Sequence, residues 1–200
     1  GFPMHKEIMD CLLCGAPLIE QVSWLTLIQR FPTTICLKCE QKFSPFQNEQ
    51  SDHRSLYHYN EAMKDYLHRY KFMYDVVLAK VFQKQLHNVF KQEQRIVVPI
   101  PMHPQKLVER TFSHIDELLI AANIPYKHLL EKTTIDTQSK KTRGERINTP
   151  QLFRVTRKID PKHYVVFDDI YTTGTTIEHA KKALVEAGAK SVASLTLIRS

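Results

Sequence analysis

The chain has 200 residues, of which 42% are hydrophobic and 24% are charged, so it is long enough for one globular domain with a small appendage. This composition excludes collagen-like, low-complexity and disordered chains, and the longest apolar runs fall well short of the roughly 20 residues that cross a bilayer. Twenty-eight Lys and Arg against 21 Asp and Glu give a formal net charge of +7, which suits nucleic acid, phosphate ligands or solubility alone. No signal segment is evident, and residues 1–3 resemble a tag remnant ahead of Met4, so we expect a cytosolic protein.

The four cysteines form two Cys-x-x-Cys pairs near the start of the chain, Cys11 with Cys14 and Cys36 with Cys39. Two such pairs place four soft thiolates around one tetrahedral ion, and zinc is the usual occupant in a reducing compartment. The alternatives are two disulfides, which imply secretion, or a redox motif, which needs only one pair. We therefore predict a zinc ribbon over residues 1–43. So short a segment buries little surface, so losing the metal should unfold the ribbon and leave the main domain folded.

Strands and helices are expected to alternate after the ribbon. Residues 44–57 are polar and are interpreted as a linker, ending in a strand near Tyr57. Asn60 is expected to cap a helix, because apolar residues recur after it at helical spacing. The later expected elements are a helix after Asp75, a strand at 96–100, a helix at 112–122, a strand at 127–130, a basic stretch up to Pro150, a strand at 164–168, a helix at 177–187 and a strand at 191–198. This order predicts an α/β domain over 58–200, with a mostly parallel sheet flanked by helices and a ligand at the carboxyl ends of the strands.

The segment 164–176 (YVVFDDIYTTGTT) carries the strongest functional signal. A buried strand delivers two adjacent carboxylates, Asp168 and Asp169 (hereafter the acid pair), to its carboxyl end. The loop that follows leads into a helix and is hereafter the threonine loop; it consists of Thr172, Thr173, Gly174, Thr175 and Thr176. Hydroxyls and backbone N–H groups at a helix N-terminus bind phosphate, and glycine lets the backbone approach it closely. Because the acid pair would repel a phosphate, it should face neutral hydroxyls or a divalent cation, and a ribose diol with magnesium fits both.

This segment resembles the phosphoribosyl pyrophosphate signature of type I phosphoribosyltransferases, with only Tyr171 at a usually aliphatic position. The resemblance implies that Asp168 and Asp169 hold the ribose hydroxyls, and that the threonine loop holds the 5-phosphate. It also implies magnesium as the cofactor that accompanies phosphoribosyl pyrophosphate.

A narrower resemblance covers nearly the whole chain. Its motifs follow the order seen in the ComF family of bacterial competence proteins: the four-cysteine ribbon, YKF at 70–72, VPIP at 98–101, RTFSH at 110–114, then Gln138, Arg146 and Asn148, and the threonine loop. Membership implies uptake of single-stranded transforming DNA at the inner face of the membrane, with a ComFA-like ATP-driven translocase that the ribbon would contact. Where the family usually reads Arg-Gly-Phe-Asn, this chain has Thr111 and Ser113 in place of the Gly and the Asn. If these two positions serve a second substrate, the chain binds phosphoribosyl pyrophosphate without ordinary transferase turnover.

Three cations are candidates for contact with the pyrophosphate. Lys71 lies at the end of an amphipathic helix, and Arg110 lies beside the turn 99–106, where pyrophosphate would sit in this architecture. Each is either a phosphate ligand or a solvated surface residue. In an active transferase, Arg146 or Lys71 would neutralise the leaving pyrophosphate while the acid pair and magnesium stabilise the ribose.

Residues 132–158 carry eight Lys and Arg against two Asp and Glu, which is nearly all of the positive excess of the chain. Such a basic loop would attract single-stranded DNA through counterion release, close over pyrophosphate, or remain a solvated loop. The candidate DNA contacts are Lys140, Lys141, Arg143 and Arg146. The aromatic side chains that could stack bases, if they share a face, are Tyr57, Tyr59, Phe72 and Tyr74.

Three functions are consistent with these signals. The first is a ComF-type protein that binds phosphoribosyl pyrophosphate and single-stranded DNA during transformation. The second is a working phosphoribosyltransferase on an unidentified base, which is disfavoured because no base-recognition segment is evident after the last expected strand. The third is a regulator that senses the sugar phosphate.

Overall fold

The computed structural model describes residues 10–18, 31–47, 49–50, 52–102, 108, 112–133 and 151–200. Its elements are α2 (Leu37–Glu40), β1 (Glu49–Gln50), β2 (His53–His58), α3 (Glu61–Phe72), the 3₁₀-helix η1 (Val76–Phe82), α4 (Gln83–Phe90), β3 (Ile96–Pro99), α6 (His114–Ala121), β4 (Leu130–Lys132), β5 (Phe153–Val155), β6 (His163–Tyr171), α8 (Thr175–Glu186) and β7 (Ser191–Arg199). Within these ranges, no helix combines the length and the apolar character that a membrane span requires.

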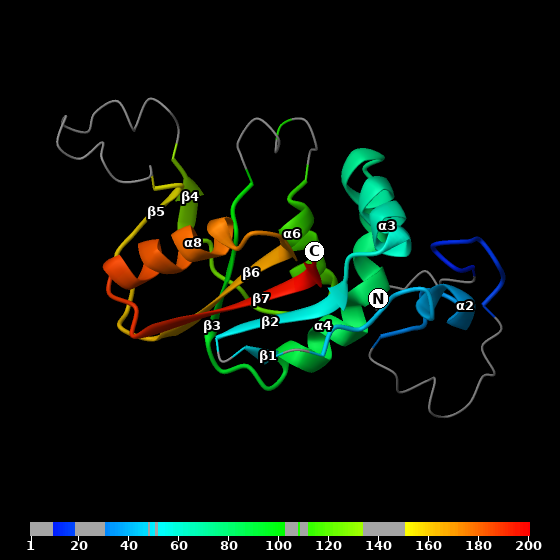
Figure 1. Cartoon of the computed structure of the whole chain (residues 1–200), viewed down its shortest axis with the longest axis horizontal. Helices are drawn as coiled ribbons and strands as arrows, with labels where there is room; N and C mark the ends of the chain where they lie inside the picture. The colour runs from blue at the N-terminus through cyan, green and yellow to red at the C-terminus, as the bar shows by residue number, and fades with distance from the viewer. Residues whose placement is uncertain are drawn as a thin grey trace, which may run out of the picture.

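The main sheet of the described chain has five strands in the order β1-β2-β7-β6-β3 (Figure 1). Neighbouring strands are parallel throughout, except that β1 runs antiparallel to β2 at the edge. The predicted α/β fold with a mostly parallel sheet is therefore confirmed. The parallel strands end at one side of the sheet, hereafter the carboxyl edge.

The strand expected near Tyr57 at the end of the segment 44–57 is present as β2, but it begins earlier, at His53, and pairs in parallel with β7 inside the main sheet. The polar composition that suggested a linker has a local explanation. His53 is buried, with its Nδ1 2.9 Å from Ser194 Oγ and its Nε2 3.0 Å from Ser55 Oγ. Ser55 Oγ in turn lies 2.8 Å from Thr196 Oγ1. These polar side chains satisfy one another between two strands, so they can be buried in a sheet.

The strand expected at 127–130 lies slightly later, as β4, and it belongs to a separate two-stranded antiparallel sheet with β5. The basic stretch 132–158 is therefore not one continuous loop. Arg154 of β5 forms an ion pair with Glu131 of β4, and Arg157 donates a hydrogen bond to the His128 carbonyl at 3.0 Å. Two of the eight cations counted in the sequence thus have partners in or beside this small sheet.

Both faces of the main sheet are covered, and successive residues of β6 point to opposite faces. Val165 and Phe167 pack in a core that includes residues of α3, η1, α4 and α6. Tyr164 and Val166 pack in a second core with residues of α8. Figure 1 shows α8 lying along β6 and β7.

The described part of the ribbon packs against α3 and shares its core. Cys11 and Cys39 are buried in the same apolar cluster as Tyr66 of α3. Arg69 of α3 donates hydrogen bonds of 2.9 Å to the backbone carbonyls of both Leu12 and Leu13. Figure 1 shows α2 beside α3 at the end of the sheet. Residues 1–9 and 19–30 of the expected ribbon lie outside the described ranges.

Candidate functional site

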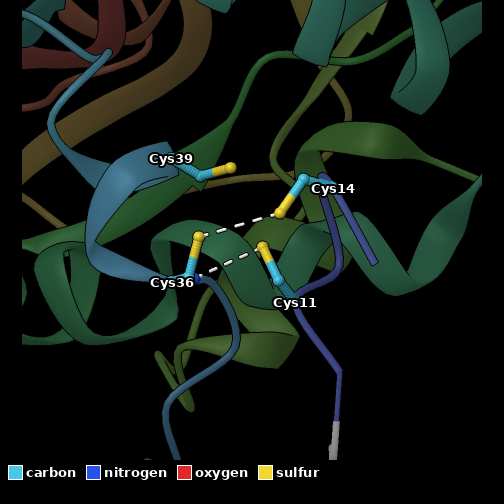
Figure 2. A group of neighbouring side chains, drawn as sticks. All are labelled: Cys11, Cys14, Cys36 and Cys39. Atoms are coloured by element: carbon cyan, nitrogen blue, oxygen red, sulfur yellow. Dashed lines mark hydrogen bonds between the residues drawn. The ribbon is translucent and has the colours of Figure 1, made fainter. Parts of the chain in front are cut away.

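The four cysteine sulfurs face one another (Figure 2). Cys11 and Cys14 come from one turn, and Cys36 and Cys39 come from the start of α2. All four Sγ atoms lie within 4.8 Å of one another, the Cys14 and Cys36 Sγ atoms are 3.7 Å apart, and all four thiols are free. The predicted cluster is therefore present as a group that could hold a metal ion.

Two of these thiols lie in contrasting electrostatic surroundings. Burial opposes ionisation of Cys11, but backbone N–H groups of Cys36, Cys14 and Leu13 outweigh it and lower the pKa of Cys11 to about 6. Burial, followed by the neighbouring cysteines, raises the pKa of Cys39 to about 12. A bound cation would reverse the second effect, since metal coordination deprotonates thiols. The donor set and its surroundings therefore suit a metal.

Asp169 of the acid pair is buried at the carboxyl edge, at 4% exposure, between two helices. Its Oδ2 forms an ion pair with Lys71 at the end of α3, and lies 3.4 Å from Nε2 of His114 at the start of α6. Lys71 is therefore not a solvated surface lysine, because its side chain is only 15% exposed. The structure brings Lys71 and the acid pair together, as the candidate site requires.

Asp168 and Asp169 extend from opposite faces of β6, because the strand continues to Tyr171 and successive side chains alternate. Asp169 points towards α3 and α6, so Asp168 follows Val166 towards the face covered by α8. The backbone N–H of Asp169 donates a hydrogen bond of 2.9 Å to Asp168 Oδ1. The threonine loop, which leads into α8, thus lies on the same side of the sheet as Asp168.

The two carboxyl groups have opposite electrostatic surroundings. Burial and the neighbouring Asp169 carboxylate raise the pKa of Asp168 well above its usual range. Burial also opposes ionisation of Asp169, but the Lys71 ammonium and His114 outweigh it and hold the pKa of Asp169 well below its usual range. Among the described residues no ion pair forms on Asp168. Asp168 is therefore the carboxyl group that a cation or a sugar hydroxyl would engage.

The threonine loop forms the N-terminus of α8. Gly174 is the N-cap residue with a left-handed φ of 83°, so no side chain caps the first turn of the helix from that position. Thr172, Thr173 and Thr175 are exposed, and the hydroxyls of Thr173 and Thr175 lie 3.0 Å apart. Exposed hydroxyls beside the positive end of a helix are what an anion site of this kind needs.

Tyr171, the unusual residue of the motif, lies beneath this loop. Its ring centroid is 4.2 Å from that of His53 and 4.0 Å from the guanidinium carbon of Arg199. Its hydroxyl lies so close to Gly174 that a Cβ atom added there would be 2.2 Å from it. No spacing in the sequence predicts this cluster, because its three aromatic or cationic members come from three different strands.

His53 should make the stability of the protein depend on pH. Burial, with the nearby charges of Arg199 and Lys181, lowers the pKa of His53 to about 4, and the Asp52 carboxylate opposes this only weakly. A histidine whose pKa falls on folding contributes stability that is fully present above about pH 6.5 and is lost as the pH falls towards 4. Between pH 7 and pH 5, we expect the free energy of unfolding of wild type to fall by about 2 kcal/mol more than that of His53→Gln, as measured by urea unfolding. Equal losses in both proteins would contradict this assignment.

The other predicted site residues fall into two groups. Those outside the described ranges are Arg110, Lys140, Lys141, Arg143 and Arg146. Of the described ones, Ser113 accepts a hydrogen bond from the Asp116 N–H at 3.3 Å and so caps α6. Tyr57 packs against Phe82, with ring centroids 5.0 Å apart, so it belongs to the core and not to a base-stacking surface. Sequence reasoning missed His114 as a partner of Asp169, although it lies in the RTFSH motif.

Comparisons with known proteins relate this chain to a domain family and to named relatives. The phosphoribosyl transferase domain family matches residues 73–200. A competence protein ComFC of Streptococcus pneumoniae (strain ATCC BAA-255 / R6) is 35% identical over 96% of this chain and 100% of its own length. A competence protein ComFC of Bacillus subtilis (strain 168) is 30% identical over 100% of this chain and 98% of its own length. An orotate phosphoribosyltransferase structure from Aeropyrum pernix has a TM-score of 0.40 and 20% identity, over 64% of this chain and 62% of that one. The chain therefore belongs to the ComFC family of competence proteins and contains a phosphoribosyl transferase domain.

Proposed function

We propose that this protein binds phosphoribosyl pyrophosphate with magnesium at the carboxyl edge and acts in the uptake of single-stranded transforming DNA. The observation that carries the first part is the grouping around one end of β6 of the partly buried Asp168, the Lys71–Asp169 ion pair and the threonine loop. Among the described residues, Asp168 forms no ion pair. The names of the relatives, both competence proteins, support the second part. The proposed partners are single-stranded DNA and a ComFA-like translocase.

Zinc is the metal we propose for the four cysteines. Four thiolates are its usual structural ligand set, and a Zn–S bond of about 2.3 Å in a tetrahedron gives sulfurs about 3.8 Å apart. The Cys14–Cys36 separation of 3.7 Å agrees with that spacing. A closed set of four protein ligands indicates a structural and not a catalytic metal.

Magnesium fits the acid pair by its donor chemistry. It prefers oxygen ligands and usually binds through one or two carboxylates plus substrate phosphates, and Asp168 offers such a carboxylate with no competing ion pair in the described chain. Bound there with the ligand, the ion would neutralise charge on the pyrophosphate. Asp168 would accept from a ribose hydroxyl, the threonine loop would hold the 5-phosphate, and Asp169 would keep Lys71 at the edge of the site.

Phosphoribosyl pyrophosphate with magnesium should stabilise the fold by about 2.7 kcal/mol at a hundredfold excess over its dissociation constant. The double change Asp168→Asn with Asp169→Asn should abolish this gain, because the diol and the cation lose their acceptors. The single change Asp168→Asn should do nearly the same without breaking the Lys71 ion pair. Thermal unfolding with and without ligand measures the gain.

The matched control is Asp160→Asn, an exposed aspartate with a surface ion pair to Lys162. It should keep the full stabilisation. A thermal shift that persists in the double variant would place the ligand elsewhere. Pyrophosphate release with a panel of bases would then separate a transferase from a protein that only binds the sugar phosphate.

Single-stranded DNA should bind mainly through basic residues of the stretch 132–158, with a steep dependence on salt. Each neutralised phosphate contributes a slope of about −0.7 in log affinity against log salt, so four to six contacts give roughly −3 to −4. Changing Lys140, Lys141, Arg143 and Arg146 to Ser should flatten the slope by about two units or more. Fluorescence anisotropy with a labelled oligonucleotide over a salt series measures it.

The control for net charge changes four other surface lysines to Ser, and these are Lys64, Lys91, Lys162 and Lys182. That variant carries the same overall charge as the quadruple variant but keeps the four candidate DNA contacts, so it should retain most of the slope. Full affinity in the loop variant would mean that DNA, if it binds, contacts another surface such as the ribbon.

A further inference from the structure

We propose that Tyr171 is a positioning residue that fixes the shape of the threonine loop by direct contact with Gly174. The inference deepens the proposed function and depends on it for its ligand, a sugar 5-phosphate. The shape of the threonine loop can be measured without any ligand.

The contact between Tyr171 and Gly174 leaves no room for a side chain. A Cβ atom added at Gly174 would lie 2.2 Å from the Tyr171 Oη and 2.6 Å from its Cζ, closer than real Cβ contacts. The φ of 83° at Gly174 is a second, independent reason for glycine, since L-residues with a side chain rarely adopt it. The tyrosine hydroxyl thus occupies the space that a side chain at position 174 would need.

The Tyr171 ring is itself held in place. His53 packs on it at 4.2 Å between centroids, and the Arg199 guanidinium carbon lies 4.0 Å from its centroid. His53 cannot easily turn away, because Ser194 and Ser55 contact its two ring nitrogens. The Tyr171 carbonyl accepts a hydrogen bond of 2.9 Å from the Ser200 N–H. The ring is therefore a fixed support and not the end of a freely rotating side chain.

This support acts at the N-cap of α8. The Gly174 carbonyl accepts the first helical hydrogen bond, from the Glu178 N–H at 2.9 Å, so the position of Gly174 sets where the first turn of α8 begins. The hydroxyls of Thr173 and Thr175 flank Gly174 and contact each other. An aliphatic side chain at position 171 is too short to fill the place of the tyrosine hydroxyl. Without that contact, the loop would gain freedom that a phosphate would have to remove on binding.

The experiment combines substitutions at the two contacting positions. Tyr171→Phe keeps the ring, Tyr171→Leu removes it, and Gly174→Ala adds the clashing Cβ. The first readout is hydrogen exchange of the amides of residues 173–177 in the ligand-free protein. The second is the affinity for ribose 5-phosphate by calorimetry. Tyr164→Phe is the matched control, because it removes a hydroxyl bonded to the Asp160 carbonyl near the other end of β6.

We expect Tyr171→Leu to speed exchange in the loop and to weaken ribose 5-phosphate about tenfold. Tyr171→Phe, which loses only the hydroxyl of the contact, should shift both in the same direction by less, and Tyr164→Phe should leave both nearly unchanged. Gly174→Ala should weaken binding more. Adding Tyr171→Leu to Gly174→Ala should then recover part of that loss instead of adding to it, because the clash is relieved.

Additive losses in the double variant, or unchanged loop exchange in Tyr171→Leu, would overturn the proposal. A different result would overturn the proposed function alone. If wild type does not bind ribose 5-phosphate while Tyr171→Leu still speeds exchange at residues 173–177, then Tyr171 positions the loop but the loop serves no sugar phosphate.

Discussion

Losing a metal bound by the four cysteines is expected to destabilise the whole domain and not only the ribbon. Structural zinc contributes on the order of 10 kcal/mol of apparent binding energy in finger-like units, whereas a whole domain is stable by about 5–15 kcal/mol. Cys11 and Cys39 lie in the same core as Tyr66 and Phe82, so an unfolded ribbon would expose that core to water. Cys39→Ser should therefore sharply lower the urea midpoint for unfolding of the main sheet.

This expectation replaces the one drawn from the sequence, in which the ribbon unfolds alone. The deciding contacts are the bonds from Arg69 to the carbonyls of Leu12 and Leu13 and the shared core, neither of which sequence spacing reveals. Hydrogen exchange of the β6 amides reports the main sheet separately from the ribbon. The control is Leu37→Ala, whose side chain is 72% exposed on α2 and should cost less than about 0.5 kcal/mol. A metal-free protein whose β6 amides stay fully protected from exchange would mean that the ribbon unfolds alone.

The parts of the fold that sequence predicted are those determined by local patterns. Continuous apolar runs predicted β3 and β6, and the cap at Asn60 is present, with its Oδ1 accepting from the Met63 N–H at 3.0 Å. A strand near Tyr57 was expected, but the start of β2 was not, because the buried residues there are polar. His53 and Ser55 look like linker residues until β7 supplies Ser194 and Thr196 as partners from the other end of the chain. Hydrophobic periodicity cannot reveal a strand whose burial depends on paired hydroxyls.

The candidate site also has some features that the local sequence predicted and others that depend on how the chain packs. The acid pair and the threonine loop were visible as one contiguous motif, and the structure places them at the carboxyl edge as expected. That Asp168 and Asp169 lie on opposite faces follows from strand alternation, but only once β6 is known to run on to Tyr171. The contacts of Asp169 with Lys71 and His114 depend on how α3 and α6 pack, which no spacing in the sequence encodes.

The Lys71–Asp169 ion pair should contribute strongly to stability, in contrast to the surface pairs of the same helix. Both partners are largely withdrawn from water, at 15% and 5% side-chain exposure. Removing one member of a buried pair leaves an uncompensated charge and typically costs 3–5 kcal/mol. Lys71→Ala should therefore destabilise the protein by about that amount in urea unfolding at pH 7. Adding Asp169→Asn should restore much of the loss, because the isolated carboxylate is then gone.

The control and the pH dependence separate this effect from a general loss of helix packing. Lys64→Ala removes a lysine of the same helix whose 3.5 Å pair with Glu61 is exposed, so it should cost less than about 0.5 kcal/mol. Because Lys71 depresses the pKa of Asp169, the stability it supplies is present above about pH 4 and is lost as the pH falls below that value. For that reason, the difference in the free energy of unfolding between wild type and Lys71→Ala should become smaller in acid. A gap that is independent of pH, with no rescue by Asp169→Asn, would mean that Lys71 stabilises α3 through its alkyl chain and not through its charge.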